Sequence, residues 1–131
     1  MKLLTTFFWI CLFTNALPIA AQSLSAKDKS IQISELPEYL VINCDNQASI
    51  LGRSIRISVQ SRNSPMEKSL HLLQELLEEA NYLKISNQTD LLTTLSALGY
   101  DFIDAFPQNT GESASFNRSG FVFRKKEKYR N

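Results

Sequence analysis

A change of hydrophobic period between two neighbouring segments constrains the fold most strongly. Residues 54–60, SIRISVQ, alternate apolar and polar side chains, which is the pattern of a strand with one buried face. Beyond Pro65 the apolar residues recur at helical spacing instead, and this spacing predicts an amphipathic helix with a broad apolar face. The stripe consists of Met66, Leu70, Leu73, Leu77 and Ala80, widened by Leu72 and Leu76.

The start of this helix has the residues of an N-terminal cap. Ser64 is a good N-cap residue, Pro65 suits the first helical position, and Glu67 completes a capping box. His71 follows among the leucines. We identify no second metal ligand at suitable spacing on its face, so a structural histidine is favoured over a ligand.

A second, shorter helix is predicted after Asn87, which is a candidate N-cap. Leucines then recur at helical spacing up to Leu98, and Gly99 follows directly. A left-handed residue that ends a helix needs a position without a Cβ. Gly99 is therefore interpreted as a structural cap and not as part of a catalytic site.

Strand patterns lie on both sides of the helices. Residues 38–44, EYLVINC, are rich in β-branched and aromatic side chains and are expected to form a hairpin with residues 54–60. Residues 100–106, YDFIDAF, are expected to alternate regularly, with Tyr100, Phe102, Asp104 and Phe106 on one face. A last strand around residues 121–124 is expected to pair with them.

These elements predict an α+β fold: a small, four-stranded, mostly antiparallel sheet with two helices packed on one face, in the order ββααββ. Residues 38–127 form this domain. Residues 22–37 are polar and mixed and are expected to be a flexible leader, with a short extended piece at residues 31–33. Residues 128–131 are expected to be a basic C-terminal tail, either frayed or able to bind a polyanion.

The first 21 residues have the composition of a secretory signal. Lys2 is followed by an apolar centre over residues 7–13 and by the small residues Ala20 and Ala21. Cleavage is expected between Ala21 and Gln22, which predicts export to the periplasm or the extracellular space. A retained membrane anchor is the alternative, although polar residues interrupt the apolar run. No membrane span is expected in the mature chain.

Charge and cysteine content narrow the function classes. Loss of the signal segment removes only Lys2 from the charged residues, so basic and acidic residues balance at 13 each. This balance argues against a nucleic-acid partner. Cys44 is the only cysteine of the mature chain, so no internal disulfide can form and stability must come from the core.

Two segments resemble a pattern found in short exported bacterial proteins of unknown function. In that pattern a leucine-rich helix is followed by Gly-Trp or Gly-Tyr, an aromatic strand, a loop and a closing strand with basic residues. The matching residues here are LLTTLSALGYDFIDAF at 91–106 and GFVFRKK at 120–126. Tyr100 stands where tryptophan is usual, and the helix after Pro65 has no match. The resemblance implies a fold and a bacterial source, but no catalytic residue.

No set of residues that could converge for catalysis is evident. Cys44 and His71 both lie in apolar-periodic segments. Asp101 and Asp104 are three residues apart, which places them on opposite faces of a regular strand. We therefore predict no catalytic residue, no metal site and no cofactor.

The sequence favours a non-catalytic binding or assembly module of the cell envelope. An unidentified protein partner, or a second copy, would contact the sheet through its face or its edge. Arg56 and Gln60, on the polar face of residues 54–60, are the candidate partner surface. The alternative is an enzyme, or a subunit of one, whose site is invisible in the sequence. A pocket holding His71 or Cys44 beside a carboxylate would favour the enzyme.

Overall fold

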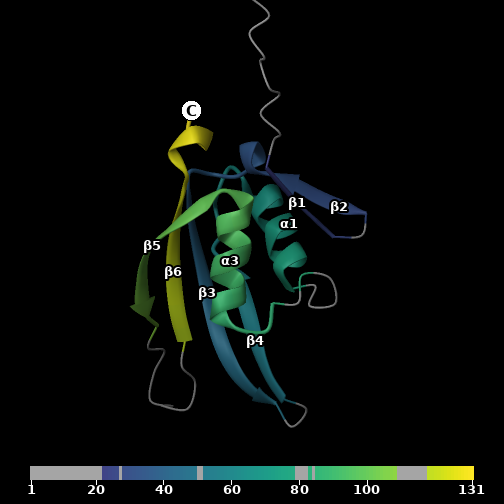
Figure 1. The fold of residues 1–131 in the computed structure, drawn as a ribbon, viewed down its shortest axis with the longest axis vertical. Helices are drawn as coiled ribbons and strands as arrows, with labels where there is room; N and C mark the ends of the chain where they lie inside the picture. The colour runs from purple at the N-terminus through teal and green to yellow at the C-terminus, as the bar shows by residue number, and fades with distance from the viewer. Residues whose placement is uncertain (1–21, 27, 50–51, 79–82, 84, 109–117) are drawn as a thin grey trace, which may run out of the picture.

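The computed structural model describes residues 22–26, 28–49, 52–78, 83, 85–108 and 118–131. The fold class is α+β, as predicted, with two helices and a sheet of four antiparallel strands (Figure 1). A separate two-stranded sheet precedes them in the chain. The predicted signal segment and Ala21 lie outside the described residues. Within the described residues, no helix has the length and apolar character needed to cross a membrane.

The four-stranded sheet has the spatial order β4-β3-β6-β5. Its strands are β3 (Tyr39–Ser49), β4 (Gly52–Val59), β5 (Tyr100–Pro107) and β6 (Arg118–Lys125). β3 pairs with β4 on one side and with β6 on the other, and β6 also pairs with β5. The edges of the sheet are therefore β4 and β5.

Two helices lie in front of this sheet in the view of Figure 1. They are α1 (Glu67–Glu78) and α3 (Gln88–Leu98). α1 packs against β4 and α3 packs against β5. The packing differs in detail from the expectation, because α1 also contacts the small N-terminal sheet.

The core lies between the helices and the sheet face that they cover. Leu73, Leu76 and Leu91 are completely buried, as are Ile42 and Cys44 of β3. Burying one leucine side chain stabilises a fold by about 1.5–3 kcal/mol, so this layer can stabilise the chain without a disulfide. Of the predicted helical stripe, Leu70, Leu73 and Leu77 are buried, Met66 is half-buried and Ala80 lies outside the described residues.

A hairpin occupies the segment where a flexible leader is expected. β1 (Ser23–Ala26) and β2 (Lys29–Gln32) pair antiparallel. A short 3-10 helix, Ile33–Glu35, follows. Ile31, Ile33 and Leu36 are buried in the main core. The physical reason is that the burial of these apolar side chains together, with the hydrogen bonds of the hairpin, offsets the chain entropy lost when the segment is ordered.

The two helices begin in different ways. At α3, Asn87 is the N-cap and its Oδ1 accepts a hydrogen bond from the backbone N–H of Asp90 at 2.9 Å. At α1, Ser64 Oγ accepts from the N–H of Met66 at 3.2 Å. In the predicted capping box this oxygen accepts from the N–H three residues on, at Glu67, so the observed contact is one residue short of it.

A β-bulge changes which residues of β5 share a face. Phe102 is paired with Phe123 and Asp104 with the next residue of β6, Val122, so Ile103 is an extra residue in the ladder. The register then shifts by one. The prediction of regular alternation is wrong here: Phe106 and Asp104 face away from the helices, while Tyr100 and Phe102 face toward them. Asp101 and Asp104 consequently lie on the same face, not on opposite ones.

Candidate functional site

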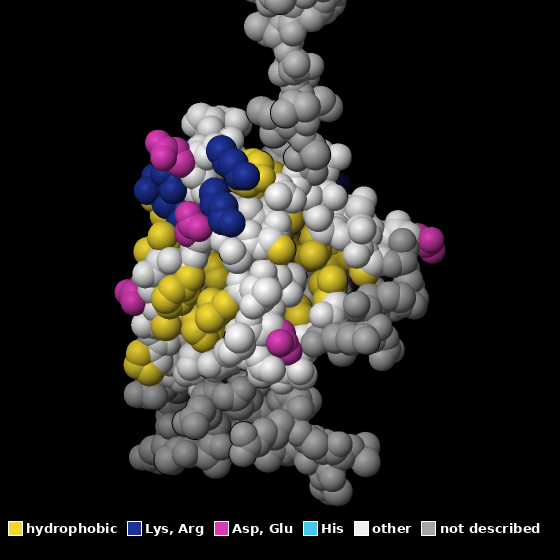
Figure 2. Space-filling model, viewed as in Figure 1, with side chains coloured by type: hydrophobic (Ala, Val, Ile, Leu, Met, Phe, Trp, Pro, Cys, Tyr) yellow, Lys and Arg dark blue, Asp and Glu magenta, His cyan; other side chains and the backbone are white. Residues whose placement is uncertain are grey.

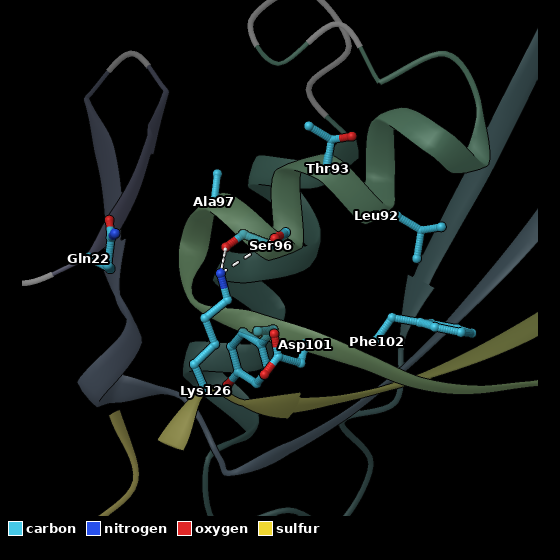
Figure 3. A pocket seen from close by; sticks show the side chains of 9 residues that line it. Gln22, Leu92, Thr93, Ser96, Ala97, Asp101, Phe102 and Lys126 are labelled. Carbon is cyan, nitrogen blue, oxygen red and sulfur yellow. Dashed lines mark hydrogen bonds between the residues drawn. The ribbon is translucent and has the colours of Figure 1, made fainter. Parts of the chain in front are cut away.

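An open groove runs between the C-terminal half of α3 and β5, and Figure 3 shows it from close by. Its volume is about 710 Å³. One wall is helical, with Leu92, Thr93, Ser96 and Ala97. The other is formed by the first residues of β5 and by Lys126, and Gln22 completes the lining.

Gly99 is responsible for the close approach of the two walls. It ends α3 in the left-handed conformation, with φ of 117° and ψ of 24°, and its N–H bonds the carbonyl groups of Leu95 and Ser96. A Cβ at this position would lie 2.7 Å from the ring of Tyr129 and would clash with Ile33. The chain can therefore reverse from helix to strand within one residue, which places β5 directly beside α3.

Tyr100 anchors the floor of the groove. Its side chain is completely buried, and its hydroxyl donates to the carbonyl oxygen of Pro37 at 2.5 Å. Burial raises the pKa of this phenol above its usual range. Gly99 and Tyr100 are thus structural residues that position the site, and neither presents a reactive group to the groove.

Lys126 closes one end of the groove. Its Nζ donates to the carbonyl oxygen of Ser96 at 3.0 Å, which Figure 3 shows as a dashed line. A cation at this place balances the unpaired carbonyl groups and the negative dipole end of α3. The ammonium group of Lys126 therefore already has a hydrogen-bond partner within the protein.

Apolar surface dominates the other end. Phe102 is 48% exposed and packs edge-on against Phe121 and Phe123, with ring centroids 6.2 Å apart in both pairs. Leu92 of α3 lies above Phe102 in Figure 3. Ile103, at the bulge, is 52% exposed. Figure 2 shows hydrophobic side chains gathered along this side of the molecule.

The outer edge of β5 is open among the described residues. β5 pairs only with β6, and none of its backbone groups bonds to any other described segment. Within the strand, Asp104 Oδ1 accepts a hydrogen bond from the N–H of Ala105 at 2.8 Å. This edge, Phe102 and Leu92 were not among the predicted site residues. The run YDFIDAF signals a partly buried strand, but the bulge that exposes Ile103 has no signature in it.

The sheet face away from the helices is less open than its sequence suggests. Arg124 bonds Glu38 at 2.7 Å and lies over the ring of Tyr39. Similarly, Arg118 pairs with Asp45 at 3.0 Å. Phe106 covers Gly120, where a Cβ would clash with its ring. Many side chains of this face thus already have partners within the sheet.

The predicted partner surface lies at the β4 end of this face. Arg56 and Gln60 are both exposed. Gln60 also lines a second pocket, of about 560 Å³, between β4 and α1. The two residues are accessible, but they are separated from the β5 groove by the width of the sheet.

The second pocket also contains His71 and Glu67. His71 Nε2 lies 3.6 Å from Glu67 Oε1, and both side chains are more than half exposed. Glu67 and Glu75 are each one helical turn from His71, so the expectation that no further metal ligand lies at suitable spacing on its face was wrong. A histidine beside a carboxylate in a pocket is the feature that would favour an enzyme. Ser58 and Ser61 line the same pocket.

Cys44 does not belong to either pocket. It is completely buried in β3, and burial raises the pKa of its thiol to about 12, with the charge of Asp45 adding to the effect. A thiol with this pKa supplies almost no thiolate at neutral pH. In the described part of the chain, no group of three or more His, Cys, Asp or Glu side chains is arranged to hold a metal ion.

Comparisons of the chain with protein-family models, with curated proteins and with solved structures gave no match.

Proposed function

We propose that this protein is an exported, non-catalytic binding module of the cell envelope that captures an extended segment of a partner protein. The segment adds as a further strand to the open edge of β5. Its side chains on one face enter the groove beside α3. The observation that supports this is the exposed apolar edge at Phe102 and Ile103, directly next to a groove.

An uncovered apolar edge is unusual in a protein that acts alone. Sheet edges offer unpaired N–H and C=O groups to any extended chain, and natural proteins usually cover or charge them. A strand that binds such an edge gains main-chain hydrogen bonds, while the pockets beside it select alternate side chains. The groove between β5 and α3 is placed to do this selection.

The two faces of β5 define the chemistry of the bound segment. Residues of the partner that point toward the helices meet Phe102 and Leu92, which favour apolar side chains. Residues that point the other way meet Asp104, which is exposed and, among the described residues, bonds only the N–H of Ala105. Asp101, which is also exposed, lines the groove at the end near Lys126 (Figure 3). Opposite charges across neighbouring strands contribute roughly 0.2–1 kcal/mol per pair. The preferred segment therefore alternates apolar and basic residues.

Labelled synthetic peptides can test this proposal by fluorescence anisotropy. A peptide that alternates valine and lysine should bind at least ten times more tightly than one that alternates valine and glutamate. Phe102→Ser and Ile103→Lys should each weaken that binding about tenfold or more. Arg56→Ala and Gln60→Ala, on the other side of the sheet, are the matched controls and should leave it unchanged.

Two results would contradict strand addition at β5. One is equal binding of the lysine and glutamate peptides, or no binding of either. The other is loss of binding in the Arg56 and Gln60 variants with no loss in the β5 variants. The second result would assign the partner to the face of the sheet near β4.

An enzyme remains the second candidate because of the pocket that contains His71. A histidine oriented by a carboxylate is a common general base, and two serine residues line the same pocket. The protein should be assayed for ester and peptide hydrolysis beside His71→Gln and Glu67→Gln. A more than tenfold loss in both variants would support an enzyme. The same background rate in all three proteins would contradict it.

A further inference from the structure

The C-terminal segment is folded onto the domain and is not the free basic tail that was expected. After β6 it forms a short 3-10 helix, Glu127–Tyr129. The N–H of Lys126 bonds the carbonyl oxygen of Gly99 at 2.8 Å, and Arg130 Nε donates to the carbonyl oxygen of Lys125 at 2.7 Å. The ring of Tyr129 rests against Gly99. These contacts hold the backbone of the segment and the side chain of Arg130 in place, while the exposed Lys128 lies over the ring of Tyr129.

A small pocket of about 240 Å³ lies beneath this segment. Three of its lining residues are basic: Lys125, Lys128 and Arg130. Ile33, Ser34, Tyr129 and Asn131 complete it. No acidic side chain lines the pocket, and it shares no lining residue with the groove at β5. The concentration of positive charge is therefore local to this pocket, although the mature chain as a whole is expected to be neutral.

Lys125 is the unusual member of this group. Only 7% of its surface is exposed, and among the described residues it is the one charged residue that is buried. No described side chain lies within hydrogen-bond or ion-pair distance of its Nζ, and the nearby Glu38 already bonds Arg124 at 2.7 Å and lies 4.0 Å from Arg130. Burial lowers the pKa of Lys125, and the charge of Glu38 opposes this only in part. The hydrocarbon part of the side chain is therefore buried, while its Nζ is not among the fully buried atoms and can reach the pocket.

We propose that this pocket binds a small oxyanion, namely a phosphate or carboxylate group of a ligand. Such a group would add a direct ion-pair partner for Lys125, which has only the more distant charge of Glu38. Lys128 and Arg130 would contact it from the 3-10 helix, and the Ser34 hydroxyl could donate to it from the opposite wall. The volume is below the range of pockets for drug-sized ligands, so only a small group would enter.

The test measures thermal unfolding in inorganic phosphate, in succinate and in chloride at one ionic strength. Phosphate or succinate should raise the melting temperature of the full chain by about 3 °C or more above chloride, because a ligand that binds only the folded state stabilises it. Isothermal titration calorimetry then gives the affinity. A response to phosphate alone identifies a phosphate ligand, and a response to succinate alone identifies a carboxylate.

Two variants show whether the pocket is responsible for the response. Lys125→Met keeps the length of the side chain and removes its charge, and it should weaken anion binding at least tenfold. Lys128→Glu reverses a charge at the exposed pocket rim and should do the same. Lys68→Glu makes the identical change on the exposed surface of α1 and is the control that should bind as the wild type does.

Several results would overturn the proposal. They are equal melting temperatures in phosphate, succinate and chloride, or an anion response that Lys128→Glu and Lys68→Glu reduce equally. The second result would mean that the anion responds to net charge and not to the pocket. Because Lys128 is exposed, its variant keeps the test decisive even if Lys125→Met does not fold.

Discussion

The two edge strands of the sheet differ in the hydrogen-bond partners of their outer backbone groups and in the side chains that they expose. At β4, the N–H of Val59 donates to Gln74 Oε1 at 3.1 Å, so a side chain of α1 already occupies part of that edge. At β5 the contact of this kind comes from the strand itself, where Asp104 Oδ1 accepts a hydrogen bond from the N–H of Ala105 at 2.8 Å, and Phe102 and Ile103 are about half exposed. A helix side chain thus caps part of the β4 edge, while no other described segment covers the β5 edge and its exposed side chains include large apolar ones.

This difference indicates where a partner would bind. A backbone group that already bonds a side chain of its own chain must lose that bond before it can bond another strand. Such a bond makes a net contribution of about 1 kcal/mol to stability. At β5 the bond from the Ala105 N–H to Asp104 Oδ1 carries the same cost, but among the described residues no side chain of another segment bonds the backbone of this strand. The bulge at Ile103 and the aspartates on either side of it disfavour unselective pairing, which is consistent with a selective partner strand.

The largest effect on this comparison is expected from Gly99, because it places β5 beside α3. Gly99→Ala should lower the free energy of unfolding by about 1 kcal/mol or more, and Gly99→Val by about 3 kcal/mol. Both would adopt a disfavoured left-handed backbone and clash with Tyr129 and Ile33. Urea unfolding measures the change. Ala97→Val, on the exposed side of α3, is the control; an equal loss there would contradict the role of Gly99.

The free energy of unfolding is expected to depend on pH through Cys44, which lies in the interior of the sheet and at neither edge. The folded pKa of Cys44 is raised from 9.0 to about 12, so between these values the unfolded chain loses a proton that the folded chain keeps. The contribution of Cys44 to stability is therefore fully present below about pH 9 and is lost as the pH rises toward the folded pKa. Between pH 8 and pH 10 the wild type should lose about 1 kcal/mol more than Cys44→Ala. Identical losses in urea unfolding under reducing conditions would contradict this.

A smaller effect is expected at the β4 edge. Gln74→Met keeps the size of the side chain but removes the bond to Val59, and it should cost about 1 kcal/mol. Hydrogen exchange of the Val59 amide should become faster in this variant while the amide of Phe123, in the sheet interior, keeps its protection. If the Val59 amide exchanges at the wild-type rate, the two edges are more alike than the structure indicates.

The smallest effect on stability is expected at the β5 edge. Ile103→Lys should change the free energy of unfolding by no more than about 0.5 kcal/mol, because the side chain is exposed and makes no core contact. The same variant is expected to weaken peptide binding strongly. A loss of more than 2 kcal/mol in urea unfolding would show that Ile103 is a packing residue, and would remove the reason for treating this edge as a binding surface.

The elements with a local periodic signal were predicted correctly. The alternation in SIRISVQ and the leucine spacing around Leu73 and Leu95 predicted strands, helices and the α+β class, because the periods of 2 and 3.6 follow from backbone geometry. The structure of residues 22–37 was not predicted. A few apolar residues in a polar segment give no periodic signal, and only the presence of a core surface to cover explains why Ile31 and Ile33 are buried there.

The groove at β5 and the basic pocket also combine features set by local sequence with features set by long-range pairing. Local patterns predicted the order of the two helices and of the four strands of the main sheet, and the turn at Gly99, but not the hairpin of β1 and β2. Which edge is open, which face holds Asp104 and which pocket holds Lys125 are properties of the tertiary structure alone. These properties depend on pairing between segments far apart in the chain, where a single bulge residue reverses every side chain beyond it and no local pattern records the shift.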